Sequence, residues 1–166
     1  MPANESAVDV AITAILDKLR TELAPGAVAI DTFTDVLTVD EEGPYDTEEI
    51  DQFPAILLLQ NEWRENEEQW FDKVEIDMNG VLALIFSGEI AEANLSVSRK
   101  VRRFVADVKK VLADDIEFGG ATMDFHVRTV TPYSYEAATG SRIAGANMRI
   151  NVKVRHARKD PYSPRN

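Results

Sequence analysis

The sequence lacks cysteine altogether and has only two histidines among its 166 residues. Without cysteine the chain can form no disulfide and no thiolate zinc site. His126 and His156 stand far apart, outside any H-E-x-x-H or comparable ligand spacing. We therefore expect polar-face or edge histidines, and neither a bound metal nor a cofactor.

Long hydrophobic runs are also missing. The longest uninterrupted apolar segment is Val81–Phe86, far below the roughly 20 residues that a membrane-spanning helix needs. The first residues, MPANESAVDV, hold no basic segment followed by an apolar one, so we expect neither a secretory signal nor a membrane partner. The composition, 45% hydrophobic and 28% charged, is typical of one globular domain.

Recognisable catalytic motifs are absent as well. The glycines at 119–120 and in Thr139–Gly145 form neither a phosphate-binding loop nor a dinucleotide-binding G-x-G-x-x-G, and turns explain them better. The acidic segment Asp40–Asp51 lacks the ligand spacing of an EF-hand, which favours a solvated loop over a cation site. No serine stands in a G-x-S-x-G context. We therefore do not expect an enzyme.

Basic residues are scarce in the first part of the chain. Residues 1–92 hold 4 Lys/Arg against 22 Asp/Glu, whereas residues 93–166 hold 14 Lys/Arg against 7 Asp/Glu, within a net charge of -11. Opposite fields on two parts of one molecule attract further copies of it as readily as foreign partners. Two interpretations remain open: the two parts pair within one monomer, or they meet between molecules.

Hydrophobic periodicity predicts the elements of the first half of the chain. Apolar residues at helical spacing predict a helix at 5–23. A short strand is expected at 28–33, and a flexible acidic surface loop at 35–51, where Gly and Pro interrupt the acidic residues. The apolar residues at 53–60 predict a central strand, which a proline near its start tolerates.

The strongest local signal is Asn79-Gly80, which separates the alternating segment Val74–Met78 from the apolar segment Val81–Phe86. Asn-Gly is the favoured pair for a type I′ turn, because both central residues of that turn need a positive φ. We therefore predict a β-hairpin whose two strands are joined at these two residues.

Periodicity in the second half predicts one long helix and two strands. An apolar stripe at spacings of three and four predicts the helix at 91–113. Alternation predicts strands at 123–128 and 148–155, each with one basic face, paired as a hairpin with a flexible tip at 137–147. The sum is a single α+β domain over residues 1–166: an antiparallel or mixed β-sheet with two helices packed on one face.

This order of elements resembles that of the tail terminator and tail completion proteins of long-tailed bacteriophages and related head-tail viruses. The residues that carry the resemblance are the aromatic-Pro entry to a strand at Phe53–Leu57, the hairpin after it, the long helix at 91–113 continuing through Leu112–Val127, and the closing segment Met148–Ser163. The resemblance covers the chain from Gln52 onward and includes no catalytic signature.

The resemblance implies a structural virion protein. Proteins of this kind form a ring, usually of six copies, that caps the tail tube and ends tail polymerisation. The ring also offers a surface to head-completion and neck proteins. The implied location is the tail or neck of the virion, after assembly in the host cytoplasm. Another neck or tail-tube component of a virion remains an alternative.

Five basic residues are the candidate contact with the next subunit or with the tube: Arg128, Arg142, Arg149, Lys153 and Arg155. A head-to-tail ring contact joins different patches of one subunit, which suits opposite charges. A small module that binds nucleic acid through the basic sheet face is a second alternative, which the acidic net charge opposes. We expect Lys153→Glu combined with Arg155→Glu to weaken assembly while the monomer stays folded.

Overall fold

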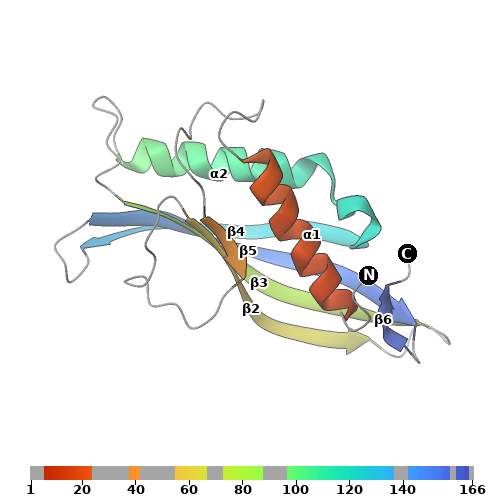
Figure 1. Cartoon of the computed structure of the whole chain (residues 1–166). Helices are drawn as coiled ribbons and strands as arrows, with labels where there is room; N and C mark the ends of the chain where they lie inside the picture. Colours follow the sequence, from red (N-terminus) through yellow and green to blue (C-terminus); the bar gives the residue numbers. More distant parts are fainter. Residues whose placement is uncertain are drawn as a thin grey trace.

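The computed structural model describes residues 6–23, 38–41, 55–66, 73–87, 97–136, 142–157 and 160–164. In chain order the elements are α1 (Ala7–Glu22), β1 (Thr38–Glu41), β2 (Ala55–Asn66), β3 (Lys73–Ser87), α2 (Val97–Asp114), the 3-10 turn η2 (Phe118–Gly120), β4 (Asp124–Glu136), β5 (Arg142–Ala157) and β6 (Asp160–Pro164). The strands form one sheet in the order β1-β2-β3-β5-β4, with β6 beside β5. Both helices lie on one face of this sheet (Figure 1). The predicted α+β fold is therefore confirmed.

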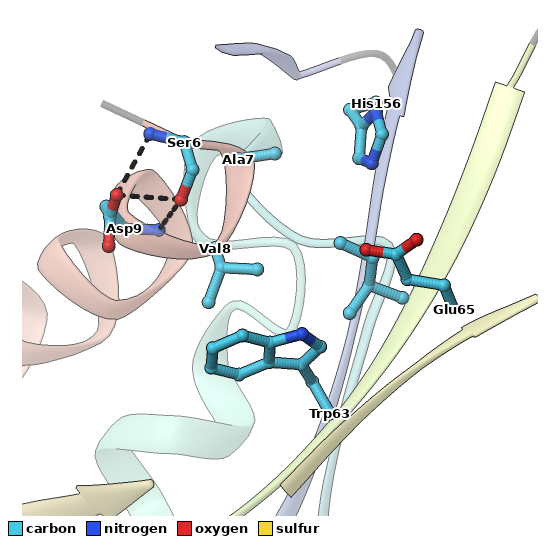
Figure 2. Close-up of a pocket in the computed structure, with 8 residues that line it drawn as sticks. Ser6, Ala7, Val8, Asp9, Trp63, Glu65 and His156 are labelled. Carbon is cyan, nitrogen blue, oxygen red and sulfur yellow. Dashed lines mark hydrogen bonds between the residues drawn. The ribbon is translucent and has the colours of Figure 1, made fainter. Parts of the chain in front are cut away.

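Helix α1 begins at a capping box. The Ser6 hydroxyl accepts a hydrogen bond from the Asp9 backbone N–H (3.2 Å), and the Asp9 carboxylate accepts one from the Ser6 N–H (2.9 Å) (Figure 2). Two N–H groups that the helix start would otherwise leave unbonded are thereby satisfied. The buried side chains of α1 follow one stripe: Ala7, Ala11, Ile12, Ile15, Leu16 and Leu19. The helix predicted at 5–23 is confirmed.

Helix α2 packs on the same face of the sheet. Its buried residues recur at spacings of three and four: Val101, Phe104, Val108, Val111 and Leu112. They form one core with α1 and with the inward side chains of β2, β3, β4 and β5. An ion pair between Lys18 Nζ and Asp114 Oδ2 (3.6 Å) joins the two helices. The predicted long helix is confirmed from residue 97 onward, and residues 91–96 lie outside the described residues.

Strands β3 and β5 form the centre of the sheet and pair antiparallel along their whole lengths. Their even-numbered side chains face the helices and build the core, while the odd-numbered ones face the other way. We call the side turned away from the helices the open face. Four apolar side chains nevertheless form a buried cluster there: Leu57, Ala83, Ile85 and Ile143. The open face is therefore apolar along one part of the sheet and polar along the rest.

The predicted hairpin at Asn79-Gly80 is wrong. Both residues lie in the middle of β3, one continuous strand with β2 on one side and β5 on the other. A turn preference acts locally, whereas pairing with two neighbouring strands satisfies the backbone along the whole element and outweighs it. Glycine has another role here, because a Cβ at Gly80 would lie 3.1 Å from the Leu59 carbonyl oxygen, next to a bulge between Gln60 and Glu62.

Two loop predictions are also corrected. Thr38–Glu41 forms β1, parallel to β2, so the loop predicted at 35–51 is wrong at these residues. The tip predicted at 137–147 is strand from Arg142 onward, because β5 continues to pair with both of its neighbours there. The strand predicted at 28–33 lies outside the described residues.

The predicted central position of β2 and the pairing of β4 with β5 are confirmed.

A tight turn built on one carboxylate connects α2 to β4. Asp115 accepts hydrogen bonds from the backbone N–H groups of Gly119 (2.9 Å) and Glu117 (3.0 Å). Gly119 has a positive φ of 67°, as a turn at this glycine requires, and Phe118 also has a positive φ of 46°. The buried Phe118 ring packs edge-on against Phe125 at 5.2 Å between centroids, which holds the residue in that strained conformation.

The hydrogen bond from the Gly119 N–H lowers the pKa of Asp115 below the usual 3.8, and the Glu117 N–H acts in the same direction. Because the folded pKa lies below the unfolded one, ionised Asp115 stabilises the fold above the unfolded pKa, and this contribution is lost as pH falls through the folded pKa. We expect Asp115→Asn to lower the free energy of unfolding at neutral pH and to have progressively less effect toward about pH 2. Urea unfolding of both proteins measures the difference between their free energies of unfolding, and this difference must become smaller in acid.

Candidate functional site

The five candidate basic residues are divided between the centre and the edge of the sheet. Four of them lie on the central strand β5: Arg142, Arg149, Lys153 and Arg155. The fifth, Arg128, lies on the edge strand β4. The alternation of β5 brings Arg149, Lys153 and Arg155 into one row on the open face. The side chain of Arg142 lies outside the described part of the structure.

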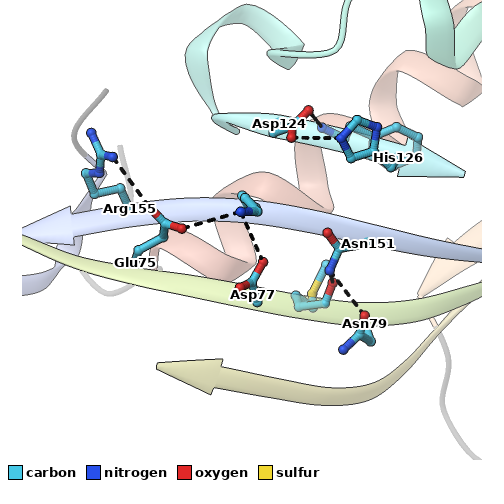
Figure 3. A network of polar contacts seen from close by, with 10 residues as sticks. Glu75, Asp77, Asn79, Asp124, His126, Asn151 and Arg155 are labelled. Carbon is cyan, nitrogen blue, oxygen red and sulfur yellow. Dashed lines mark hydrogen bonds and ion pairs between the residues drawn. The ribbon is translucent and has the colours of Figure 1, made fainter. Parts of the chain in front are cut away.

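Acidic residues of the same molecule hold Lys153 and Arg155. Lys153 Nζ lies 3.6 Å from Glu75 Oε1 and 3.9 Å from Asp77 Oδ1 (Figure 3). Arg155 Nη2 lies 3.5 Å from Glu75 Oε2, and both of these side chains are only 12% exposed. Water and salt therefore screen this pair less than a surface pair. For these two cations, the charge split along the sequence is compensated within the monomer.

These contacts argue against the expectation that Lys153→Glu with Arg155→Glu leaves the monomer folded. The double substitution would gather four carboxylates, at positions 75, 77, 153 and 155, on one partly buried stretch of the sheet. Mutual repulsion and the loss of both cations act against the folded state. A loss of assembly in that variant would therefore report on stability as well as on an interface.

Asparagine, histidine and aspartate side chains continue the row on the open face. Asn151 is buried, and its Nδ2 donates to Asn79 Oδ1 (3.1 Å) across the boundary between β5 and β3. On β4, His126 Nε2 lies 2.9 Å from Asp124 Oδ2 (Figure 3). His126 is exposed, which agrees with the predicted polar-face histidine. Asn151 and Asn79 bond to each other at the boundary between β5 and β3, and His126 and Asp124 do so on the edge strand β4.

Arg128 and Arg149 have a different environment. Both are exposed, and neither has an ion-pair partner within the residues that the structure describes. A bulge in β4 between Val127 and Thr129 leaves Arg128 as an extra residue opposite Arg149. Among the described strands, β4 has a neighbour on one side only. The bulge therefore places two exposed arginines at neighbouring positions of β4 and β5, close to the edge that β4 forms among the described strands.

The outer face of α2 carries a second set of exposed cations: Arg99, Arg102, Arg103, Lys109 and Lys110. In the part of the chain that the structure covers, none of them has an ion-pair partner. Helix α2 lies beside β4 and β5. It contacts β5, and its Leu112 lines a cavity of about 330 Å³ together with Phe125 of β4. Exposed cations thus gather on one side of the molecule, formed by β4, β5 and α2, which we call the basic half.

The opposite side, formed by β1 and β2, is acidic, and we call it the acidic half. Glu62 and Glu65 are exposed on β2, and Arg64 between them is bonded to Glu62 (3.1 Å). The sequence of the edge strand β1 includes Asp40 and Glu41. The strand order β1-β2-β3-β5-β4 therefore separates the acidic strands β1 and β2 from β5, whose charged residues are all basic, and from β4, which carries Arg128 together with Asp124 and Glu136. Charges compensate one another where β3 meets β5, and each outer side keeps an excess of one sign.

Two features of the candidate site were not predicted from the sequence. Glu75 and Asp77 were predicted as polar positions of a hairpin strand, and their alternation does place them on one face, but only the strand order puts Lys153 opposite them. Trp63 lies in a segment for which no element was predicted, and it is 55% exposed on β2. The available signal was the unusual occurrence of an indole within a highly acidic stretch.

Within the described residues, no three His, Asp or Glu side chains are placed to hold a metal ion together. In the same part of the chain, no helix has both the length and the apolar character needed to cross a membrane. No protein-family model matches the sequence, and no curated protein matches it. Function is therefore inferred from the charges and contacts of this chain.

Proposed function

We propose that this chain is a structural virion protein of the tail terminator kind. Its copies form a ring, of six in the arrangement that the resemblance implies, which caps the tail tube and forms the interface to the head and neck. The observation that carries the proposal is the separation of charge across the sheet, with the acidic half at β1 and β2 and the basic half at β4, β5 and α2. The α+β fold with two helices on one face is the fold that the resemblance implies.

Opposite charges on opposite sides of a subunit favour head-to-tail contacts. In such a contact the basic half of one copy meets the acidic half of the next, and repetition around an axis closes a ring. Pairing through identical surfaces is disfavoured, because like charges then face one another. The long-range attraction also orients two copies before they touch. The charge pattern therefore supports a closed ring more than a two-fold dimer.

Arg128 and Arg149 are the cations that we assign to this contact. They are exposed and without ion pairs in the described part of the chain, whereas Lys153 and Arg155 are already held by Glu75. An exposed ion pair contributes only about 0–1 kcal/mol, so these two arginines serve chiefly the register and the rate of association.

The size of the purified protein tests the proposal. Light scattering is expected to show a ring-sized species, alone or with the tail-tube protein of the same virus, and rising salt should weaken it. A protein that stays monomeric at every concentration and never joins tail tubes contradicts the proposal. Association with a different virion partner would instead favour another neck or tail-tube component.

Arg128→Glu combined with Arg149→Glu is expected to weaken self-association about tenfold or more, because it places like charges opposite the acidic half of the next copy. Thermal unfolding should stay close to that of the wild type, since both side chains are exposed. Sedimentation measures the association. Arg64→Glu is the control, because it makes the same kind of charge reversal at one site in the acidic half and should not weaken assembly. Equal behaviour of the two variants would remove Arg128 and Arg149 from the contact.

Nucleic-acid binding through the basic half is the second candidate function. The exposed cations of α2 favour it, since clustered Lys and Arg on one helix face are typical of phosphate contacts. The net charge of -11 opposes it, because the acidic half repels phosphate at long range. We expect no salt-dependent binding of DNA or RNA in fluorescence anisotropy. Tight binding that weakens steeply with salt would favour this candidate over the ring.

A further inference from the structure

A small cavity opens at the start of α1. Trp63, Glu65 and His156 form one wall, and the first turn of α1 forms the other (Figure 2). Its volume is about 200 Å³, below the roughly 300–1,000 Å³ of typical small-molecule sites. The cavity is therefore sized for one long side chain rather than for a metabolite.

His156 is a buried polar residue that lines the cavity and makes one hydrogen bond among the described residues. The residue is 6% exposed, and its Nδ1 lies 2.8 Å from the carbonyl oxygen of Ala157. A carbonyl oxygen only accepts, so Nδ1 carries the hydrogen and Nε2 of the neutral ring carries a lone pair. Among the described residues, no donor reaches Nε2. The imidazole is thus an acceptor at the wall of the cavity, where a donor from another molecule can reach it.

Two exposed side chains of β2 complete a site for a cation. The Trp63 indole is 55% exposed, and Glu65 adds an exposed carboxylate on the same wall (Figure 2). No Lys or Arg of the described residues lines the cavity. The positive end of α1 is already compensated, because the Asp9 carboxylate caps its first turn. An aromatic face, a carboxylate and an imidazole acceptor together select a guanidinium group, which stacks on indole and donates several hydrogen bonds.

Exposed arginines that fit this description occur at the start of α2: Arg99, Arg102 and Arg103. Their guanidinium groups have no ion-pair partners in the described ranges. Figure 1 places the start of α2 and the start of α1 at opposite ends of the molecule. One copy therefore cannot fill its own cavity with these side chains, whereas the next copy in a head-to-tail row can.

We propose that this cavity receives an arginine from the start of α2 of a second copy of this chain. The inference rests on the proposed ring and names the contact that fixes its register. The arginine stem lies on Val8 and Ile76, and its guanidinium group stacks on Trp63 and donates to Glu65 and His156. A partly exposed Trp that closes over an arginine is the kind of anchor on which interface energy concentrates.

The absence of native cysteine allows a direct test by cross-linking. One copy carries Glu65→Cys, and the other carries Arg99→Cys, Arg102→Cys or Arg103→Cys in turn. After mixing and oxidation with copper phenanthroline, we expect a disulfide-linked heterodimer for at least one of the three. About tenfold less product is expected when Arg64→Cys replaces Glu65→Cys, because residue 64 points to the open face and residue 65 to the helix face.

Association of substituted proteins gives a second measurement. Trp63→Ala and Glu65→Lys are each expected to raise the dissociation constant about tenfold, with unchanged circular dichroism. If Trp63→Ala does not fold, Glu65→Lys and the cross-link still decide the question. A wild-type ring whose variants assemble normally, with no cross-link above the control, overturns the cavity contact and leaves the ring standing. A wild-type protein that never assembles overturns the proposed function, and the cavity contact with it.

Discussion

Replacing Gly145 with alanine is expected to lower the free energy of unfolding by about 3 kcal/mol. Gly145 lies inside β5, opposite Ile85 of β3 and Tyr133 of β4. A Cβ at this position would overlap the Leu84 carbonyl oxygen and would lie 2.8 Å from the Tyr133 hydroxyl oxygen. One obstacle is backbone and the other is a packed ring, so the methyl group fits only if β3 and β5 move apart.

The Tyr133 ring occupies the space that a side chain at position 145 would need. It lies over Gly145, and its hydroxyl donates to the Leu84 carbonyl oxygen (3.3 Å), so one aromatic side chain covers a strand position that has no side chain of its own. Gly80→Ala is the matched control, because its Cβ would meet the Leu59 carbonyl oxygen at 3.1 Å, which a small shift relieves. We expect Gly80→Ala to cost about 1 kcal/mol. Urea unfolding compares the free energies of unfolding of the wild type and the two variants. Equal losses in both variants would contradict a special need for glycine at position 145.

Replacing Arg155 with glutamate is expected to destabilise the fold by roughly 3–5 kcal/mol. The substitution removes a cation from Glu75 where both side chains are only 12% exposed, and it adds a second carboxylate beside the first. Lys153 remains 3.6 Å from Glu75 and limits the loss, but it cannot neutralise an additional charge as well. The destabilisation is measured by denaturant unfolding at neutral pH.

Arg149→Glu and a charge exchange serve as controls for this prediction. Arg149 lies on the same strand and the same face as Arg155, but it is exposed, so its substitution should change stability by no more than about 0.5 kcal/mol. Exchanging the partners, as Glu75→Arg with Arg155→Glu, should recover more than half of the lost stability. If Arg155→Glu proves as mild as Arg149→Glu, the pair with Glu75 is not a structural contact.

The helices and the alternation in β4 and β5 were predictable because burying an apolar stripe is a local requirement. The stripe through Val101, Phe104 and Val108 leaves one face of α2 able to pack, whatever lies beneath it. Alternation in β4 and β5 likewise determines which side chains turn inward. For this reason the predicted elements and the observed ones agree most closely at α1, α2, β4 and β5.

The elements that were not predicted depend on distant partners. Asn79-Gly80 has strong turn chemistry, yet it passes straight through β3, because β2 and β5 pair with that strand on both sides. Strand β1 is a short acidic segment that becomes a strand through parallel pairing with β2. Strand β6 is likewise a short segment that becomes a strand by pairing with the end of β5. No local pattern distinguishes such segments from loops, because the pairing partner is chosen by the fold.

The candidate contact residues, too, were predictable in part from local pattern and in part depend on distant partners. Five cations of one chain were grouped by charge and alternation, but strand order placed Glu75 beside Lys153 and Arg155 and left Arg128 and Arg149 exposed. The cavity at Trp63 joins β2, β5 and the start of α1, which are far apart along the chain. Periodicity could not have revealed it.

The residues themselves determine the class of the fold, the positions of the two helices and an uneven distribution of charge along the chain. These are properties of local spacing and composition, and they hold before any two distant segments meet. Strand order then converts a charge split along the sequence into one across the molecule, because β1 and β2 lie on one side and β4 on the other. The pairing of β3 with β5 then decides that Lys153 and Arg155 meet carboxylates of the same molecule, because it places Glu75 and Asp77 opposite them.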